Sequence, residues 1–558
     1  MMQALQRKSG VYEWAAMAGY IALLAVAVPR HVFWADETQS WIIARDCSLS
    51  DIFLHRMHYE GTPALWALLL WMLQRLHLPF AAMHWAAALA AIGGVAVWLC
   101  YAPLPRYLKL LFPFTFFMAY QYAVVARSYV LFPLLVFAAC ALITVKDRPR
   151  PVLLAIVLGL LANLCMFGTA AAAGLTLVYM DRVRRDGTWK RLRGRYLGAF
   201  GIVCAAAVIA ALTAWPARDV AFTAGILDLP SVQKALHRGQ AAAWNAEADD
   251  TSPEATAPYD VSLLPPPSTG SHWKDKLWLA SHDEYLGAPA AAHHVYLTER
   301  AIFAASLLMF PLSGSMGLAY ALVAALLYRC IRQRDPAATL PFLFVFLVSV
   351  AIYAAEHHSG LLLISLIAGA WLTWPAAIPG RGVSRWMELA LRGLLLIVFA
   401  VQIGWTVHAL CSERHTEYSG DRQAAVFLRQ NAAGKKIAGY YTMSDGIELY
   451  FPRNIFFNQP SSYWQYSSAP GLMMSQANVL AAHPDFVVIG TTAFRDQVIL
   501  NQILPMLPAI QEYPGDYQGV EAYFMQHGYR ETHRFCGLEP MRGGATNELC
   551  QIVLEPGA

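Results

Sequence analysis

The sequence has few charged residues for its length. Asp, Glu, Lys and Arg make up 14% of its 558 residues, against about 25% in ordinary soluble proteins. Basic residues outnumber acidic ones by only 41 to 37, so the small net positive charge does not indicate a nucleic-acid partner. The nine cysteines include no CxxC pair, and the chain contains neither GxGxxG nor a P-loop. A zinc ribbon, a thioredoxin-like redox motif and the common nucleotide-binding loops are therefore excluded.

Apolar residues dominate instead, at 57% of the chain, and the mean hydropathy is +0.40. A membrane-spanning helix needs ~20 mostly apolar residues, because lipid offers the backbone no hydrogen-bond partner. Runs of that kind occur at residues 11–29, 82–103, 107–124, 128–145, 196–214, 297–328, 337–353, 359–378 and 386–409. The sequence therefore predicts a mainly α-helical, polytopic membrane bundle.

Two further apolar stretches have unusual lengths. Residues 152–180 are too long for one crossing, so we expect a tight helical hairpin with its tip near Phe167-Gly168. Residues 62–77 are short for an upright crossing and are expected to form a re-entrant or tilted helix. Together these stretches predict about 11 to 13 transmembrane helices.

The orientation follows from the basic residues of short loops, which favour the cytoplasmic side. Basic clusters lie at Arg7-Lys8, Arg106/Lys109, Lys146/Arg148/Arg150, Arg182 to Arg195, Arg329/Arg332/Arg334 and Arg381/Arg385. Placing them all in the cytoplasm puts the N-terminus inside and the chain after about residue 410 outside. Residues 11–29 could instead be a cleaved signal peptide, because Arg7-Lys8 precede the run and Ala25-Val26-Ala27 resembles a cleavage site.

This orientation divides the chain into a membrane domain (residues 1–410, with outer loops 30–61 and 215–296) and an outer domain (residues 411–558). The outer domain alternates helix-like and strand-like runs, which indicates a small extracytoplasmic α/β domain. We expect it to act as a lid or docking domain rather than as a second active site. Cys536 and Cys550 lie in two of its strand-like runs, where a disulfide is plausible in an oxidising compartment.

The first outer loop carries two acidic sites. Asp36-Glu37 stands in WADETQSW just beyond the first apolar run, and His58-Tyr59-Glu60 opens the next one. An acidic pair in a loop is usually only solvated, but the flanking tryptophans suit a membrane interface or a sugar-binding surface. The residues between could form a helix lying flat on the membrane, and both acidic sites could then face one pocket.

Two cationic sites fall on the same side. Arg127 lies between apolar runs in YQYAVVARSYVLFPLLVF, where it should face a cavity, an anionic group or the interface. Snorkelling at a helix end is the plainer alternative. Arginine pairs well with phosphate through its planar fork, and Tyr129 could line the same space. His357 and His358 in EHHSG could hold a phosphate or transfer protons, although hydrogen-bonded packing is the commoner role of such residues.

The acidic and cationic residues predicted on the outer side of the membrane suit one kind of chemistry. A carboxylate can activate an acceptor as a general base, while cations stabilise a phosphate that leaves from a lipid carrier. The set consists of Asp36, Glu37, Glu60, Arg127, His357 and His358.

The segments WADETQSW, HYEGTPALWALLLW, ARSYVLFPLL and EHHSG resemble the GT-C superfamily of membrane glycosyltransferases. The resemblance is to the bacterial relatives of protein O-mannosyltransferases and of the aminoarabinose transferase that modifies lipid A, and so to a glycosyltransferase family 39-like protein. It covers most of residues 11–410. The second motif departs from the family pattern, because it reads EGTP where many members have His-Pro-Pro or Glu-Lys-Pro.

The resemblance implies a polyprenyl-phosphate-linked sugar donor, used on the periplasmic side of a bacterial inner membrane. Asp36 would be the general base for the acceptor hydroxyl or amine, and Glu37 would orient donor or acceptor. Glu60 would be the second acidic residue and Arg127 would hold the lipid phosphate, in a transfer that inverts the anomeric configuration. The remaining candidate substrate-binding residues are Tyr129, Tyr59, His58, His357 and His358.

We expect no required cofactor, although a divalent cation is possible because some superfamily members use one. The acceptor could be a lipid, a polysaccharide or a protein. Two alternatives stay open: a transporter or flippase of lipid-linked sugars, and a polysaccharide polymerase or ligase that uses a diphosphate-linked donor. Transporters usually contain inverted repeats and polar groups near the membrane midplane, and neither is evident in this sequence.

Overall fold

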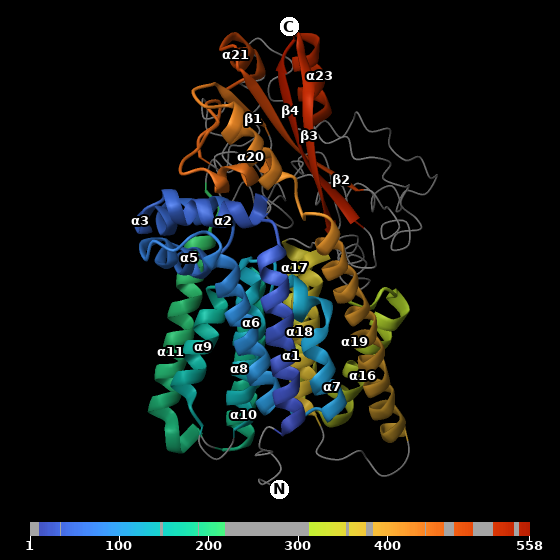
Figure 1. The fold of residues 1–558 in the computed structure, drawn as a ribbon. Coiled ribbons are helices and arrows are strands. Elements are labelled where there is room, and N and C mark those ends of the chain that lie inside the picture. The colour runs from blue at the N-terminus through green and yellow to red at the C-terminus, as the bar shows by residue number, and fades with distance from the viewer. Residues whose placement is uncertain are drawn as a thin grey trace, which may run out of the picture.

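The computed structural model describes residues 10–33, 35–145, 149–187, 189–217, 312–352, 356–374, 383–440, 442–461, 474–494, 517–540 and 546–557. These residues form three layers stacked along one axis (Figure 1). Apolar helices form a bundle at the lower end, short helices lie across its upper end, and a small domain with a four-stranded sheet stands on top. Helix α1 begins at the end of the bundle that lies farthest from the C-terminal domain.

The bundle is helical throughout. Its main helices are α1 (Val11–Ala27), α6 (Ala82–Tyr101), α8 (Leu131–Thr144), α9 (Pro151–Ala162), α10 (Met166–Arg185), α11 (Trp189–Ala214), α16 (Met316–Gln333), α17 (Leu340–Ala351), α18 (Ser359–Thr373) and α19 (Val383–His415). Four segments within the described ranges are long and apolar enough to cross a membrane: Val11–Arg30, Ala82–Tyr101, Leu192–Ala214 and Arg385–His415. These apolar helices indicate a membrane protein. The expected 11 to 13 crossings are not confirmed.

Residues 107–124, which we predicted to form one spanning helix, are broken into pieces. Helix α7 (Arg106–Leu111) gives way to the 3-10 turn η4 (Phe112–Phe114) and then to the π-helical turn η5 (Phe117–Gln121). Proline in η4 supplies no amide donor, and the Thr115 hydroxyl donates to the Phe112 carbonyl at 2.7 Å. Irregular backbone at membrane depth is tolerated where protein covers it, and Phe112, Pro113 and residues 115–120 are buried.

The predicted hairpin within residues 152–180 is confirmed, but its tip lies a few residues earlier than expected. Helix α9 ends at Ala162 and α10 starts at Met166. Gly168 lies inside α10, and a Cβ there would meet the Leu161 carbonyl oxygen at 2.2 Å. The glycine therefore allows the close approach of the two helices, not the turn between them.

The layer across the upper end consists of short helices from the first outer loop. They are α2 (Ala35–Asp46), α3 (Leu49–Asp51), the π turn η3 (Ile52–Arg56), α4 (Met57–Glu60) and α5 (Leu65–Arg75). Figure 1 shows α2 and α3 lying across the bundle, as expected for a flat helix. With 11 residues, α5 is about 16 Å long. That is about half the hydrocarbon thickness, so α5 does not span the membrane.

The C-terminal domain follows α19 and contains a mixed sheet. Its strands are β1 (Ile437–Tyr440), β2 (Phe486–Phe494), β3 (Tyr529–Pro540) and β4 (Thr546–Pro556), in the order β1-β2-β4-β3. β1 and β2 are parallel, and the other pairs are antiparallel. Alternate residues face two small cores, one covered by α20 (Asp421–Asn431) and the other by α21 (Gln476–Ala481) and α23 (Tyr517–Gln526). Cys536 and Cys550 lie opposite each other on β3 and β4 and form the disulfide that the sequence made plausible.

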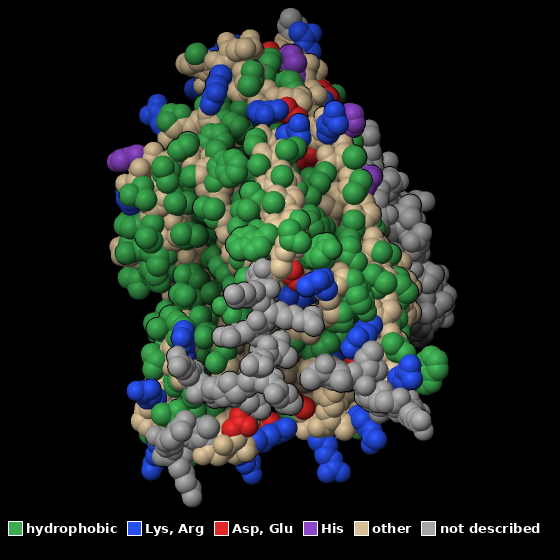
Figure 2. All heavy atoms as spheres, turned by 60° about the horizontal axis from the view of Figure 1, so that its bottom comes forward, with side chains coloured by type: hydrophobic (Ala, Val, Ile, Leu, Met, Phe, Trp, Pro, Cys, Tyr) green, Lys and Arg blue, Asp and Glu red, His purple; other side chains and the backbone are tan. Residues whose placement is uncertain are grey.

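Charged side chains mark the lower end of the bundle. Figure 2 turns that end forward and shows Lys and Arg along it and again near the top of the view, with a broad hydrophobic surface between. The positive-inside rule would place this end in the cytoplasm, opposite the C-terminal domain. The large outer loop predicted at 215–296 lies outside the described residues, except for its first three positions.

Candidate active site

Asp36 and Glu37 occupy the first turn of α2, at the upper end of the bundle. A helix N-terminus favours negative side chains, because unpaired amide groups point out of it. Consecutive residues on a helix point about 100° apart, so the two carboxylates take different surroundings. The Asp36 side chain is 23% exposed, whereas that of Glu37 is fully buried.

Asp36 forms an ion pair with Arg127, which precedes the 3-10 turn η6 (Ser128–Val130) and helix α8. The Arg127 side chain is 25% exposed, and its guanidinium also lies over the Tyr129 ring, 5.5 Å from the centroid. The expected meeting of the first acidic motif and this arginine is therefore confirmed. An arginine between a carboxylate and open surface has donors for both, because the guanidinium carries five N–H groups.

Glu60 lies close enough to Asp36 and Arg127 to interact with both charges. It ends α4, where Gly61 at φ +59° closes the helix. Gln39 on α2 donates to Glu60 Oε1 at 2.8 Å. Burial raises the pKa of Glu60 to about 8, the negative charge of Asp36 adds to the rise, and Arg127 opposes it. Glu60 is therefore protonated at neutral pH and can donate a hydrogen bond.

The histidine pair approaches from α18. His357 and His358 lie in η11 (Glu356–His358), and the Tyr129 hydroxyl is 3.0 Å from Nε2 of the buried His358. The Tyr122 hydroxyl donates to the His357 carbonyl at 2.6 Å. Arg127, Tyr129 and the histidine pair thus form one contiguous row. The structure brings these predicted residues together with Asp36 and Glu60.

His58 and Tyr59 precede Glu60 on α4. His58 Nδ1 hydrogen-bonds the carbonyl oxygen of Trp215, and its own carbonyl accepts from Ala217 at 3.3 Å. These bonds tie α4 to the residues that follow α11. Tyr59 is half-buried on the same short helix.

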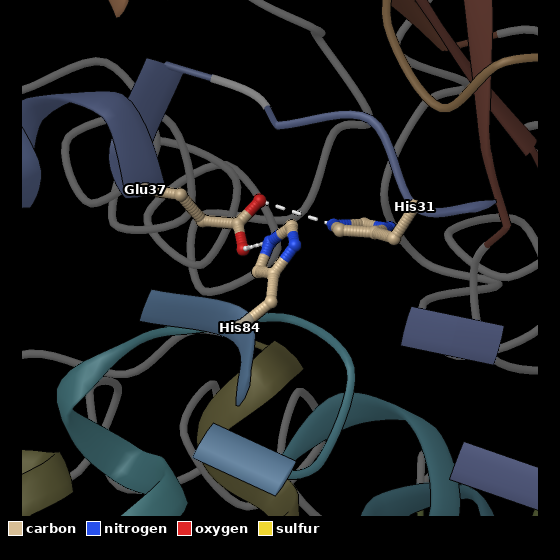
Figure 3. Close-up of side chains that lie close together, drawn as sticks. All are labelled: His31, Glu37 and His84. Atoms are coloured by element: carbon tan, nitrogen blue, oxygen red, sulfur yellow. Dashed lines mark hydrogen bonds and ion pairs between the residues drawn. The ribbon is translucent and has the colours of Figure 1, made fainter. Parts of the chain in front are cut away.

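Sequence reasoning missed a buried cluster behind the acidic motif, shown in Figure 3. His31 Nε2 lies 3.1 Å from one carboxylate oxygen of Glu37, and His84 Nε2 lies 2.9 Å from the other. The Ala126 amide donates to the same oxygen as His84, at 2.6 Å. His31 Nδ1 lies 2.6 Å from Oε1 of Glu413, near the end of α19. His31 shares the HVFWADE segment with the motif, but its partners come from distant parts of the chain.

The charges of this cluster stabilise one another. Burial opposes the charged form of His31, but the carboxylates of Glu413 and Glu37 outweigh it and raise the pKa of His31 to about 10. Burial would raise the pKa of Glu37, but the positive charge of His31 and the hydrogen bonds from His31 and His84 hold that pKa well below its usual range. Potential ligand atoms of His31, Glu37 and His84 lie within 4.8 Å of one another, so these three residues could also hold a divalent ion.

The C-terminal domain covers α2 and the segment before it. Arg45 Nη1 donates to the Glu448 and Phe451 carbonyls, at 3.3 and 2.9 Å, near the end of η12 (Thr442–Tyr450). The Ser419 hydroxyl donates to the Phe33 carbonyl at 2.8 Å. The domain therefore rests on the helix that carries Asp36.

No family model matches the chain, and no curated protein matches it. One solved structure to which the chain is similar is the arabinofuranosyltransferase AftD from mycobacteria, with a TM-score of 0.36 and 11% sequence identity. The similarity covers 98% of this chain and 40% of AftD. A likeness of this extent assigns no activity to the chain.

Proposed function

We propose that the protein is an integral membrane glycosyltransferase of the GT-C type. It would move a sugar from a polyprenyl-phosphate carrier to a hydroxyl or amine of a lipid, polysaccharide or protein acceptor. The observation that carries this proposal is the partly exposed ion pair of Asp36 and Arg127, at the end of an apolar bundle. The motif resemblance suggests the reaction class. In the ion pair, Asp36 would be the base and Arg127 the phosphate ligand, and the two side chains are in contact.

In the proposed reaction the acceptor oxygen or nitrogen attacks the anomeric carbon opposite the phosphate. The bond between that carbon and the phosphate oxygen breaks, and the bonding electrons leave with the polyprenyl phosphate. Asp36 takes the acceptor proton as general base. The product has the inverted anomeric configuration, because one displacement occurs with no covalent enzyme intermediate.

Arg127 would bind the phosphate while it still contacts Asp36, since a guanidinium can bridge two anions. Tyr129, His357 and His358 continue from Arg127 along the same row and would donate hydrogen bonds to the carrier phosphate. Glu60, neutral at pH 7, would donate a hydrogen bond to a sugar oxygen. We assign no required metal to this chemistry, because the positive charge for the leaving phosphate comes from Arg127.

The membrane setting and orientation belong to the same proposal. The carrier is a lipid, so its headgroup meets the protein where the bundle ends. We place the site and the C-terminal domain on the periplasmic side of a bacterial inner membrane, because the basic clusters of the short loops favour the cytoplasmic side for the opposite end of the bundle.

The test is a transfer assay with purified full-length protein in detergent and three donor classes: a polyprenyl-monophosphate sugar, a polyprenyl-diphosphate sugar and a nucleotide sugar. We expect product from the monophosphate donor alone, with the inverted anomeric configuration by NMR. Product from the diphosphate donor alone would support the polymerase or ligase alternative. Carrier movement across vesicles with no product from any donor would support the transporter alternative.

A further inference from the structure

Two adjacent residues of the acidic motif contact two adjacent residues of a distant segment. Asp36 pairs with Arg127, and the carboxylate of Glu37 accepts the amide of Ala126 at 2.6 Å. The second contact fixes the backbone that carries the arginine against the helix that carries the base. Glu37 therefore sets the relative position of Asp36 and Arg127 without reaching the surface itself.

Glu37 is held from behind by two imidazoles. His84, near the start of α6, contacts one carboxylate oxygen, and its ring stacks on Phe33 with 3.7 Å between centroids and 10° between planes. His31 contacts the other oxygen through Nε2, and its Nδ1 contacts the carboxylate of Glu413. A buried carboxylate with donors on both oxygens has little freedom to turn.

The network also reaches the C-terminal domain. Glu413 accepts a hydrogen bond from the Tyr120 hydroxyl, so α19 is tied to η5 at the same point. The Tyr418 ring packs edge-on against His31, with 4.6 Å between centroids. The Tyr418 hydroxyl donates to Glu539 on β3 at 2.7 Å. The outer domain thus connects to the back of the acidic motif through His31.

The contacts favour hydrogen bonding over a metal ion in this cluster. His31 has a carboxylate oxygen within hydrogen-bond distance of each ring nitrogen, which suits a doubly protonated imidazolium. A metal ligand must instead offer one nitrogen lone pair to the ion. The Glu37 oxygen nearest His84 already accepts the Ala126 amide, which can only donate.

We propose that His31, His84 and Glu413 are positioning residues, which act through Glu37 to hold Asp36 and Arg127 in the geometry for transfer. This inference rests on the proposed function. A displacement of about 1 Å at a reacting group can lower a rate 10²-fold, so loosening the network acts on turnover.

The experiment compares His84→Leu with His84→Gln in the full-length protein. Leucine removes the donor to Glu37, whereas the glutamine amide restores one. We expect His84→Leu to lower kcat by about 10- to 100-fold with KM for the donor changed less than threefold, and His84→Gln to recover most of the loss. His55→Leu is the matched control, because His55 is exposed on η3 in the same outer layer; it should leave kcat unchanged.

Amide hydrogen exchange provides a readout that does not need activity. In Glu37→Ala and His84→Leu, peptides that contain Ala126 and Arg127 should exchange faster, while peptides of the outer sheet should not change. A wild-type kcat in a folded His84→Leu variant would overturn the inference even if transfer itself is established. Unchanged exchange at Ala126 in both variants would overturn it independently of any transfer assay. Stoichiometric zinc in the purified protein, lost in His84→Leu, would also overturn it in favour of a metal centre.

Discussion

Asp36 and Arg127 are 91 positions apart in the chain, yet their side chains form an ion pair at the upper end of the bundle. One comes from the first turn of a helix that lies across the bundle, and the other precedes a helix inside it. A carboxylate alone could serve many surface roles. Its pairing with an arginine beside a tyrosine and a histidine pair is the basis on which we propose phosphate-linked chemistry at this end of the molecule.

Removing the arginine tests the phosphate assignment. We expect Arg127→Ala to lower kcat/KM for the polyprenyl-phosphate donor by about 10²- to 10³-fold, because the leaving phosphate loses its charged ligand. Arg127→Lys should recover only part of the lost kcat/KM, since an ammonium lacks the planar fork of donors that a guanidinium offers to phosphate. Steady-state kinetics check both, with Arg75→Ala as the control. Arg75 is an exposed arginine of α5, stacked on Trp71. Equal losses in the Arg75 and Arg127 variants would contradict the assignment.

The raised pKa of Glu60 predicts a pH dependence. With a pKa of about 8, the carboxyl is protonated at neutral pH and ionises as the pH rises. A hydrogen bond donated by Glu60 would then be lost, so kcat should fall as the pH rises through about 8. Glu60→Gln keeps a neutral donor at this position and should remove the fall. A pH–rate profile with the same alkaline limb in both proteins would rule out this role.

The disulfide should stabilise the outer domain. Cys536 and Cys550 are 14 positions apart in sequence, and closing a loop of that size stabilises a fold by about 2–4 kcal/mol. We expect Cys536→Ser with Cys550→Ser to lower the unfolding temperature of the sheet domain, and a reducing agent to do the same to the wild type. Cys204→Ser, at an exposed free cysteine in the bundle, is the control. Thermal unfolding of the wild type, measured with and without reductant, tests this prediction. Equal unfolding temperatures would exclude a stabilising disulfide.

The close approach of α18 to η5 depends on a glycine. A Cβ at Gly360 would meet ring atoms of Phe117 and Tyr122, at 2.4 and 2.6 Å. Gly360→Ala should therefore destabilise the bundle by about 1–3 kcal/mol through overpacking. It should also weaken carrier binding, because His358 is the N-cap of α18. Gly393→Ala is the control, since no atom lies within 4 Å of a Cβ there. Thermal unfolding should show a lower stability for Gly360→Ala than for Gly393→Ala, and carrier titration should show weaker binding. Equal values for the two variants would contradict the prediction.

Much of the candidate site could be predicted from the sequence, because charge is rare in an apolar chain. Asp36, Glu60 and Arg127 stood out as costly charges at the ends of apolar runs, and one orientation rule placed them on one side. The alternation of helices and strands was also predictable, since it depends on local patterns, whereas the disulfide was only plausible until the structure placed Cys536 opposite Cys550. His31 and His84 were not, because each is a single histidine in an apolar segment whose partners lie far along the chain.

Helix continuity was harder to predict than helix position. Residues 107–124 are apolar enough for a span, and hydropathy does not register that the proline in η4 and the Thr115 hydroxyl break the backbone pattern. The sequence predicts the hairpin tip near Phe167-Gly168, whereas the turn lies between Ala162 and Met166 and Gly168 allows two helices to touch. Both errors have the same origin: composition measures affinity for lipid, while packing against neighbours decides where a helix bends or ends.

The most direct test of the account compares Asp36→Asn with Asp46→Asn. Both aspartates lie on α2, and each pairs with an arginine, so the two variants remove equivalent charges from one helix. Single-turnover transfer at saturating polyprenyl-phosphate sugar should fall by about 10²- to 10⁴-fold in Asp36→Asn, because the general base is lost. It should stay within threefold of wild type in Asp46→Asn. A folded Asp36→Asn protein that transfers sugar at the wild-type rate would contradict the central claim.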